Sequence, residues 1–141
     1  TNPSVASGDG LAMAVRAGAA SKDMAFFQFH PTALMADNVK PFLITEALRG
    51  EGGVLLDNEG LSSYRRGDLE PKNYSFTLQS SPDGSLATRD IVARACDQRM
   101  KITGADNVWL VTEHLSKEKL HSEFPNIESK LNKLSIIIIS K

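Results

Sequence analysis

The chain has 141 residues, the size of one domain or of part of a larger protein. With 41% hydrophobic and 23% charged residues, its composition is typical of a globular protein and excludes a largely disordered one. The formal net charge of -1 gives no electrostatic basis for binding nucleic acid or an anionic membrane surface.

The cysteine content and the two ends of the chain bear on its cellular location. Cys96 is the only cysteine, which excludes an intrachain disulfide and favours a reducing compartment. No signal-peptide pattern opens the chain, and the longest aliphatic run, residues 136–139, is far too short to span a bilayer. We therefore expect a cytoplasmic protein, with an organelle as the alternative. The chain starts without Met and stops just after a strand-like run, so we interpret both ends as cuts in a longer protein.

The first expected elements are a helix and a strand. Residues 11–20 are rich in alanine and predict a helix packed closely against a sheet. Asp9 lies at the start of this helix, where its carboxylate meets the positive end of the helix dipole. The aromatic residues 24–29 predict a buried strand, which ends at His30 because Pro31 cannot donate to a sheet.

The middle of the chain predicts shorter elements. Residues 42–48 are apolar and predict a helix, and the glycines that follow end it. Residues 54–56 predict a short strand, closed by a turn at residues 57–60. Residues 62–84 are polar, contain proline and serine, and show little periodicity. This stretch therefore predicts an exposed loop.

The last third predicts one long helix and several short elements. Thr88 is the expected N-cap of a helix that ends near Gly104. The apolar residues of this helix fall on one face: Ile91, Val92, Ala95, Cys96 and Met100. A strand is expected over residues 108–111, with short helices over residues 117–124 and 127–134.

The pattern as a whole predicts the α+β class, with a final strand over residues 136–139. No Gly-x-Gly-x-x-Gly turn follows a strand, so the usual pyrophosphate-binding turn is absent from the sequence. No metal site is expected, because His114 and His121 lack the spacing to Cys96 or to each other that such a site requires.

Three places combine polar side chains with irregular backbone. Gln28 and His30 lie two residues apart and would share one side of a strand, offering hydrogen-bond donors to an anion. Glu46 and Arg49 are three apart and can pair on a helix. Arg89 opens a helix and presents a planar fork of donors that suits a carboxylate. Taken singly, the commoner interpretations are a histidine that closes a turn, a surface ion pair and a solvated arginine.

The order of these motifs is more specific than any one of them. The sequence contains Thr1-Asn2-Pro3 with Ser7-Gly8-Asp9-Gly10, then Phe27-Gln28-Phe29-His30-Pro31-Thr32, then Thr45-Glu46-Ala47-Leu48-Arg49-Gly50-Glu51-Gly52-Gly53, then Arg89-Asp90-Ile91-Val92-Ala93-Arg94-Ala95. In this order they resemble the succinate dehydrogenase and fumarate reductase flavoprotein family. Residues 46–52, 108–114 and 124–127 are most similar to the branch of the family that oxidises L-aspartate.

The resemblance implies a fold and a set of site residues. It implies that residues 1–32 are the end of an FAD-binding domain and residues 33–141 most of a capping domain, both incomplete, with residues 62–84 as an exposed loop. It implies that Asp9 contacts FAD. It implies that His30, Thr45 and Glu46 bind a substrate carboxylate, with Gln28 beside them. It implies that Arg89 lies over the flavin and handles the proton. The pKa of arginine exceeds about 12, so Arg89 is a poor base and could act only through a relay or by orienting the substrate.

The resemblance also implies a reaction. It is hydride transfer from the α-carbon of L-aspartate to FAD, giving iminoaspartate, with oxygen or fumarate reoxidising the flavin and quinolinate synthase as a partner on the way to NAD. Two alternatives remain: a fumarate reductase or succinate dehydrogenase flavoprotein fragment, and a non-enzymatic truncated remnant. The motivation for the remnant is that the nucleotide-binding strand and its glycine turn lie outside the chain. Residues 61–66 also depart from the Arg-Phe-Met turn of the family, which bears on the folding of the capping domain. The isolated chain is expected to be inactive.

Overall fold

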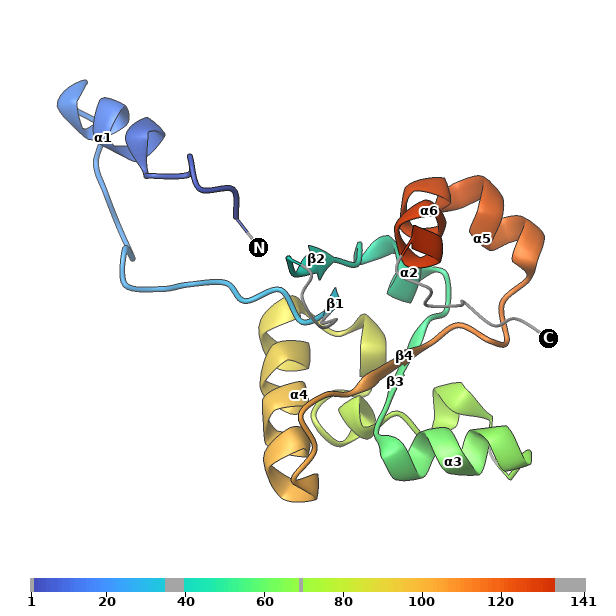
Figure 1. The fold of residues 1–141 in the computed structure, drawn as a ribbon. Helices are drawn as coiled ribbons and strands as arrows, with labels where there is room; N and C mark the ends of the chain where they lie inside the picture. The colour runs from blue at the N-terminus through green and yellow to red at the C-terminus, as the bar shows by residue number, and fades with distance from the viewer. Residues whose placement is uncertain (1, 35–39, 69, 134–141) are drawn as a thin grey trace.

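The computed structural model describes residues 2–34, 40–68 and 70–133, and its elements are mixed (Figure 1). Strands β1 (Ala33–Leu34) and β2 (Phe42–Leu43) form one antiparallel pair. Strands β3 (Val54–Leu56) and β4 (Trp109–Val111) form a second antiparallel pair. Helices lie around both pairs, so the α+β class is confirmed.

The side chains of β3 alternate between two apolar clusters, as the pleat of a strand requires. Leu55 packs with residues of the long helix α4 (Arg89–Thr103), among them Val92 and Cys96. Val54 and Leu56 point to the other side, where they meet α3 (Asn58–Arg66). Burial raises the pKa of the Cys96 thiol to about 11, which fits the predicted core residue rather than a nucleophile.

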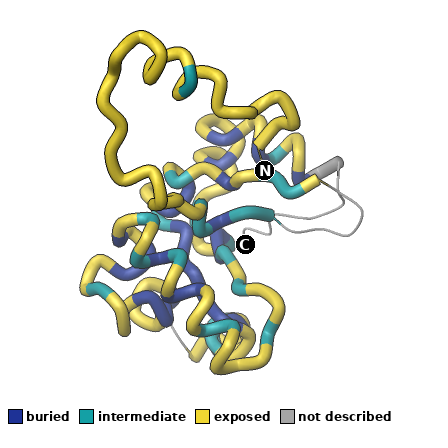
Figure 2. The backbone as a smooth tube through the Cα atoms, turned by 90° about the vertical axis from the view of Figure 1, so that its left-hand side faces the viewer, coloured by how far each residue is buried: buried dark blue, intermediate teal, exposed yellow. Residues whose placement is uncertain are grey.

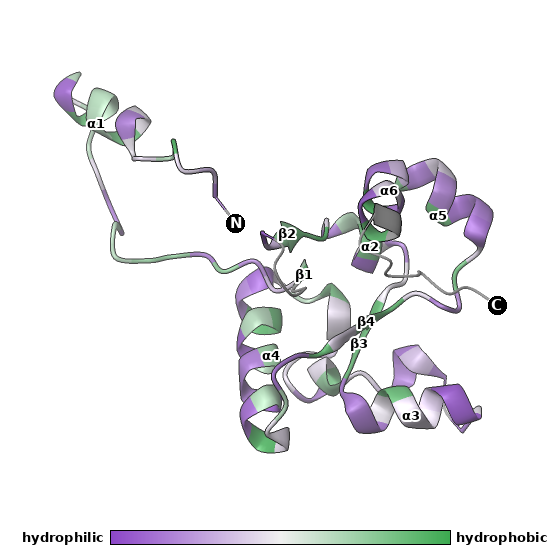
Figure 3. Ribbon diagram, viewed as in Figure 1, coloured by the Kyte–Doolittle hydropathy of each residue, from purple (hydrophilic) through white to green (hydrophobic). Residues whose placement is uncertain are grey.

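A third cluster joins the segment around α2 (Ala47–Gly50) to the C-terminal helices. These are α5 (Lys117–Glu123) and α6 (Pro125–Lys133), whose polar faces appear as hydrophilic ribbon in Figure 3. The buried members of the cluster are Ile44, Leu48, Leu120, Phe124, Ile127 and Leu131. The two helices confirm the prediction for this region, up to the last described residue. The strand predicted over residues 136–139 lies outside the described residues.

Helix α4 confirms its predicted bounds, with Thr88 at the N-cap and Gly104 at the C-cap. Gly104 adopts φ 68°, a left-handed conformation that glycine tolerates better than other residues. The Thr88 hydroxyl donates to Asp90 at 2.6 Å instead of capping the helix backbone. The bond stabilises the carboxylate and lowers the pKa of Asp90.

The prediction for the N-terminal segment is wrong in two respects. Helix α1 (Asp9–Arg16) is shorter than predicted and has no buried residue. Residues 24–29 form no strand, and the side chains of Phe26, Phe27 and Phe29 are 82%, 83% and 74% exposed. A strand needs a neighbour for its backbone hydrogen bonds, and no described strand pairs with residues 24–29, which belong to an almost entirely exposed N-terminal arm (Figure 2).

Two predictions in the middle of the chain are also wrong in part. The helix expected over residues 42–48 is β2 followed by the short α2, because residues 42–43 pair with β1. The turn expected at residues 57–60 is the start of α3, since the Asp57 carboxylate accepts from the backbone N–H of Gly60 at 2.7 Å.

The exposed loop predicted over residues 62–84 is not found. It contains the second half of α3 and then the 3-10 turns η1 (Pro71–Asn73) and η2 (Phe76–Gln79), followed by η3 (Gly84–Leu86). Phe76 is 6% exposed and packs against Leu55 and α4, so residues 75–77 are part of the core, while most of the residues around them are exposed. The sequence looks loop-like because the buried side chains beside Phe76 are hydroxyls rather than apolar groups.

Candidate functional site

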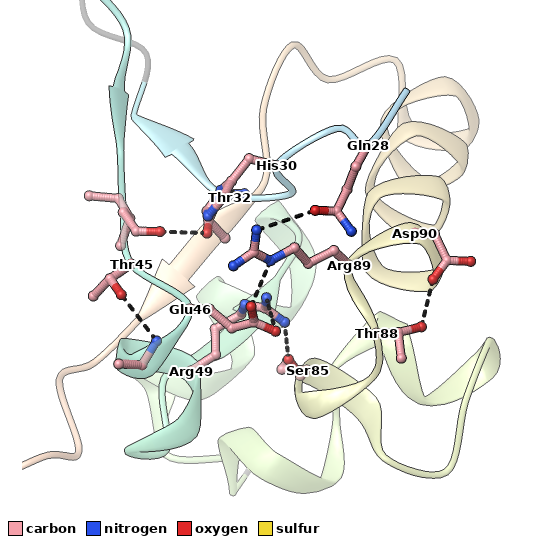
Figure 4. A network of polar contacts seen from close by, with 12 residues as sticks. Gln28, His30, Thr32, Thr45, Glu46, Arg49, Ser85, Thr88, Arg89 and Asp90 are labelled. Atoms are coloured by element: carbon pink, nitrogen blue, oxygen red, sulfur yellow. Dashed lines mark hydrogen bonds and ion pairs between the residues drawn. The ribbon is translucent and has the colours of Figure 1, made fainter. Parts of the chain in front are cut away.

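Polar side chains from three distant parts of the sequence meet at the start of α4 (Figure 4). Arg89, the first residue of α4, donates from Nε to Glu46 Oε2 at 2.7 Å. It also donates from Nη1 to Gln28 Oε1 at 3.4 Å. These contacts span 43 and 61 residues of sequence, so three of the predicted site residues lie together.

Glu46 lies between two arginines. Its Oε1 is 3.5 Å from Nη2 of Arg49, while its Oε2 accepts from Arg89. The hydrogen bond from Arg89 is the largest cause that lowers the pKa of Glu46, and the charges of both arginines add to it. Glu46 is therefore ionised at neutral pH.

Arg49 also belongs to the site. The commoner interpretation of its sequence position was one half of a surface ion pair. Its side chain is only 1% exposed, and its Nη1 donates to the carbonyl of Ser85. Nε and Nη2 of Arg49 have no hydrogen-bond partner within the described residues. Burial lowers the pKa of Arg49, although an arginine remains charged. The i,i+3 spacing from Glu46 was the available signal for the pairing, but spacing carries no information about burial.

His30 lies beside this group in its neutral form. The backbone N–H of Thr32 donates to His30 Nδ1 at 3.3 Å, so the neutral ring carries its proton on Nε2. Burial lowers the pKa of His30, and the charges of Arg89 and Arg49 lower it further. An anion at His30 would therefore meet the N–H of a neutral ring rather than a protonated ring.

We predict that Arg89→Leu raises the pKa of His30, because it removes the arginine charge that lowers this pKa more strongly than that of Arg49 does. The measurement is an NMR titration of the three histidines in the chain, with Arg94→Leu on the same helix as the control. Because folded His30 binds a proton less readily than the unfolded chain, its contribution to stability is lost as the pH falls below the ordinary histidine range. A His30 pKa that stays fixed in Arg89→Leu contradicts the assigned proximity.

Two predicted residues are not brought into contact with the others. The Thr45 hydroxyl accepts from the backbone N–H of Ala47 at 3.4 Å, where it supports the start of α2. Asp9 accepts from the Ser7 hydroxyl at 2.9 Å, on an exposed helix that lies away from α4 (Figure 1). Neither residue has a hydrogen bond to Glu46 or Arg89.

The described residues do not enclose the site. A cavity of about 570 Å³ is lined by His30 and Thr32 but not by Glu46 or Arg89. The side chains of Arg89 and Glu46 are instead 39% and 43% exposed. With two arginines, one glutamate and a neutral histidine, the site carries a net charge of +1, although only Arg89 of the two arginines is exposed on its open surface. Such a surface suits an anionic ligand that is covered from its other side.

Comparison with known proteins identifies the family of the chain. The sequence matches the FAD binding domain family over residues 1–140. The chain belongs to this family. It is 44% identical over 136 residues to the L-aspartate oxidase of Yersinia pestis, which covers 96% of this chain and 23% of that protein. It is 44% identical over 131 residues to that of a Nostoc species, covering 90% and 20%. A Nicotiana tabacum protein named as a chloroplastic L-aspartate oxidase is 43% identical over 139 residues, covering 92% and 19%.

These matches confirm the resemblance to a flavoprotein family and to its L-aspartate-oxidising branch, with FAD as the cofactor. The chain spans about a fifth to a quarter of the length of the relatives it matches. Among the described residues, no helix combines the length and apolar character needed to cross a membrane.

The described residues fit FAD as one wall of its site. Gln28, Glu46 and Arg89 are accessible from one side and offer a planar cation beside amide and carboxylate groups. Phe27 and Phe29, on either side of Gln28, expose apolar surface that an aromatic ring system or a further protein segment could cover. Most of the contacts to a dinucleotide would have to come from residues outside this chain.

Proposed function

We propose that this chain supplies part of the substrate pocket of an FAD-dependent L-aspartate oxidase. The observation that carries the proposal is the contact of Arg89 with Glu46 and Gln28, because it joins three motifs that the resemblance assigns to one pocket. In this proposal residues 1–32 end the FAD-binding domain and residues 33–141 belong to the capping domain. The exposed aromatic side chains before His30 support it, since they leave a surface for the rest of that domain.

The chemistry of the site suits a small dicarboxylate. A substrate with two carboxylates needs donors at both ends, and His30 Nε2 and the Arg89 guanidinium are donors from separate segments. Thr45 and Glu46 are the further proposed substrate contacts, with Gln28 holding Arg89 from the other side. Contact of Asp9 with FAD is proposed on the resemblance alone.

Arg89 and Glu46 together can handle the proton of the reaction. When bound, FAD supplies the acceptor for the hydride that leaves the α-carbon. Arg89 orients the substrate through its Nη groups, of which Nη1 also donates to Gln28, while its Nε donates to the ionised Glu46 at 2.7 Å. In a relay through this pair, an Nη nitrogen of Arg89 would take up the substrate proton as the Nε–H proton passes to Glu46, so the guanidinium stays charged and arginine need not act as a base alone.

The wider setting follows from the same proposal. Oxygen or fumarate reoxidises the flavin, and iminoaspartate passes to quinolinate synthase for NAD synthesis. A cytoplasmic location, or an organelle such as the one named for the Nicotiana relative, remains part of the proposal.

The test uses a hybrid enzyme in which this chain replaces the matching segment of the Yersinia pestis L-aspartate oxidase. We expect the hybrid enzyme to bind FAD and to reduce it with L-aspartate, measured by bleaching of the flavin absorbance under anaerobic conditions. Succinate is tested beside it, and faster reduction by succinate would assign the site to a succinate dehydrogenase or fumarate reductase.

The isolated 141-residue chain serves as the second half of the experiment. We expect it to be purified without a flavin spectrum and to leave L-aspartate unchanged, because most of the cofactor site is missing. A yellow, active chain would overturn this expectation. A hybrid enzyme that binds FAD but reacts with neither substrate would favour the non-enzymatic remnant.

A further inference from the structure

Three buried hydroxyls lie between β3 and the start of α4. Ser75, Thr77 and Ser85 are 4%, 0% and 8% exposed. Ser75 and Thr77 come from the stretch that was predicted as an exposed loop, and Ser85 directly follows it. Each hydroxyl has partners, so none is left unsatisfied within the described residues.

The three hydroxyls form a closed network on the backbone of Leu55, the middle residue of β3. Ser75 Oγ donates to the Leu55 carbonyl at 2.7 Å, and the Leu55 N–H donates to Ser85 Oγ at 3.1 Å. Ser75 Oγ lies 2.6 Å from Thr77 Oγ1 and 3.1 Å from Ser85 Oγ. Because a carbonyl can only accept, Ser75 must donate its one hydroxyl proton to Leu55, and its oxygen then accepts from both Thr77 and Ser85. The network therefore has a defined direction and holds residues 75–85 at a fixed place along β3.

Ser85 connects this network to both arginines of the site. Its backbone carbonyl accepts from Arg49 Nη1, and its place in the chain is four residues before Arg89. Arg49 and Arg89 in turn flank the two oxygens of Glu46. A shift of Ser85 relative to β3 would thus change the place of Arg89 relative to Glu46.

We propose that the hydroxyl network of Ser75, Thr77 and Ser85 is a positioning device that sets Arg89 against Glu46 by fixing the start of α4 to β3. The inference rests on the proposed function, in which Arg89 and Glu46 handle substrate. The hydrogen bonds of the three residues go to Leu55, to one another and, from the Ser85 carbonyl, to Arg49, so they act through Arg49 and the α4 N-terminus.

The test is an NMR titration of the Glu46 carboxylate in the 141-residue chain. Ser85→Ala removes the acceptor of the Leu55 N–H, so we expect Arg89 to move away and the pKa of Glu46 to rise towards its ordinary value. Thr77→Val keeps the side-chain shape and loses one hydroxyl, so we expect a smaller rise in the same direction. Thr77→Ser retains the hydroxyl and should restore the wild-type pKa.

The control separates positioning from loss of stability. Leu61→Ala opens a cavity in another cluster and should destabilise the chain without moving the Glu46 pKa. An unchanged Glu46 pKa in folded Thr77→Val and Ser85→Ala overturns the proposal, as does an equal shift in Leu61→Ala. If Ser85→Ala does not fold, the comparison of Thr77→Val with Thr77→Ser decides.

The hybrid enzyme gives an independent kinetic measurement. Ser85→Ala should lower kcat for L-aspartate by about 10- to 100-fold while KM changes little, since misplaced catalytic geometry acts mainly on the chemical step. A rise in KM with an unchanged kcat overturns the positioning role. If the unmodified hybrid enzyme is inactive, the proposed function fails, while the titration of Glu46 still decides whether the network positions Arg89.

Discussion

Arg89→Leu should lower kcat for L-aspartate in the hybrid enzyme by about 1,000-fold while FAD stays bound. Leucine preserves most of the apolar stem of the arginine but offers no donor to a carboxylate and no N–H to Glu46. The measurements are steady-state turnover and the flavin absorbance spectrum. Full turnover in Arg89→Leu contradicts the role proposed for this residue.

Arg94→Leu is the matched control for that substitution. Arg94 lies on the same helix, is 73% exposed and pairs only with Asp90 among the described residues. Arg94→Leu removes one positive charge, as Arg89→Leu does, but at a position that does not contact Glu46 among the described residues. We expect kcat within about twofold of the unmodified hybrid enzyme, since a surface ion pair contributes little. Equal losses in Arg89→Leu and Arg94→Leu would indicate a general effect of charge rather than a local one.

The elements that the sequence predicted well are those whose causes are local. Helix α4 has a threonine at its start, a glycine at its end and apolar residues at helical spacing between them. Strand β3 is a short aliphatic run between turn residues. In each case neighbours within a few positions carry the information, so no knowledge of the tertiary structure was needed.

The elements that the sequence predicted poorly depend on distant partners. The aromatic residues 24–29 favour a strand, but a strand forms only where another backbone supplies hydrogen bonds. Ser75 and Thr77 look like loop residues because their burial depends on the backbone of Leu55, twenty or more positions away. Arg49 was predicted to pair with Glu46, but its burial depends on contacts with Ser85 and α4.

In the candidate site, too, local features were predictable from the sequence and long-range contacts were not. The chemistry of Gln28, Glu46 and Arg89 was visible in the sequence, but only the family resemblance predicted that they meet. The structure brings these three together and leaves Asp9 and Thr45 outside their hydrogen bonds. The segment that carries Asp9 has no buried residue, so no internal packing fixes it against the site.

Phe76→Ala should destabilise the chain by about 3–5 kcal/mol, because it removes a buried aromatic ring from the cluster formed by Leu55 and α4. A domain of this size has a total stability of about 5–15 kcal/mol, so the loss is a large share of it and the midpoint of urea unfolding should fall clearly. Tyr74→Ala is the matched control, since Tyr74 belongs to the same stretch and is 54% exposed. Its cost should stay within about 1 kcal/mol. Urea unfolding followed by the fluorescence of Trp109 measures both. Equal, small effects of the two substitutions would show that residues 71–79 are a solvated loop after all, and the hydroxyl network beside Phe76 could then not hold α4 in place.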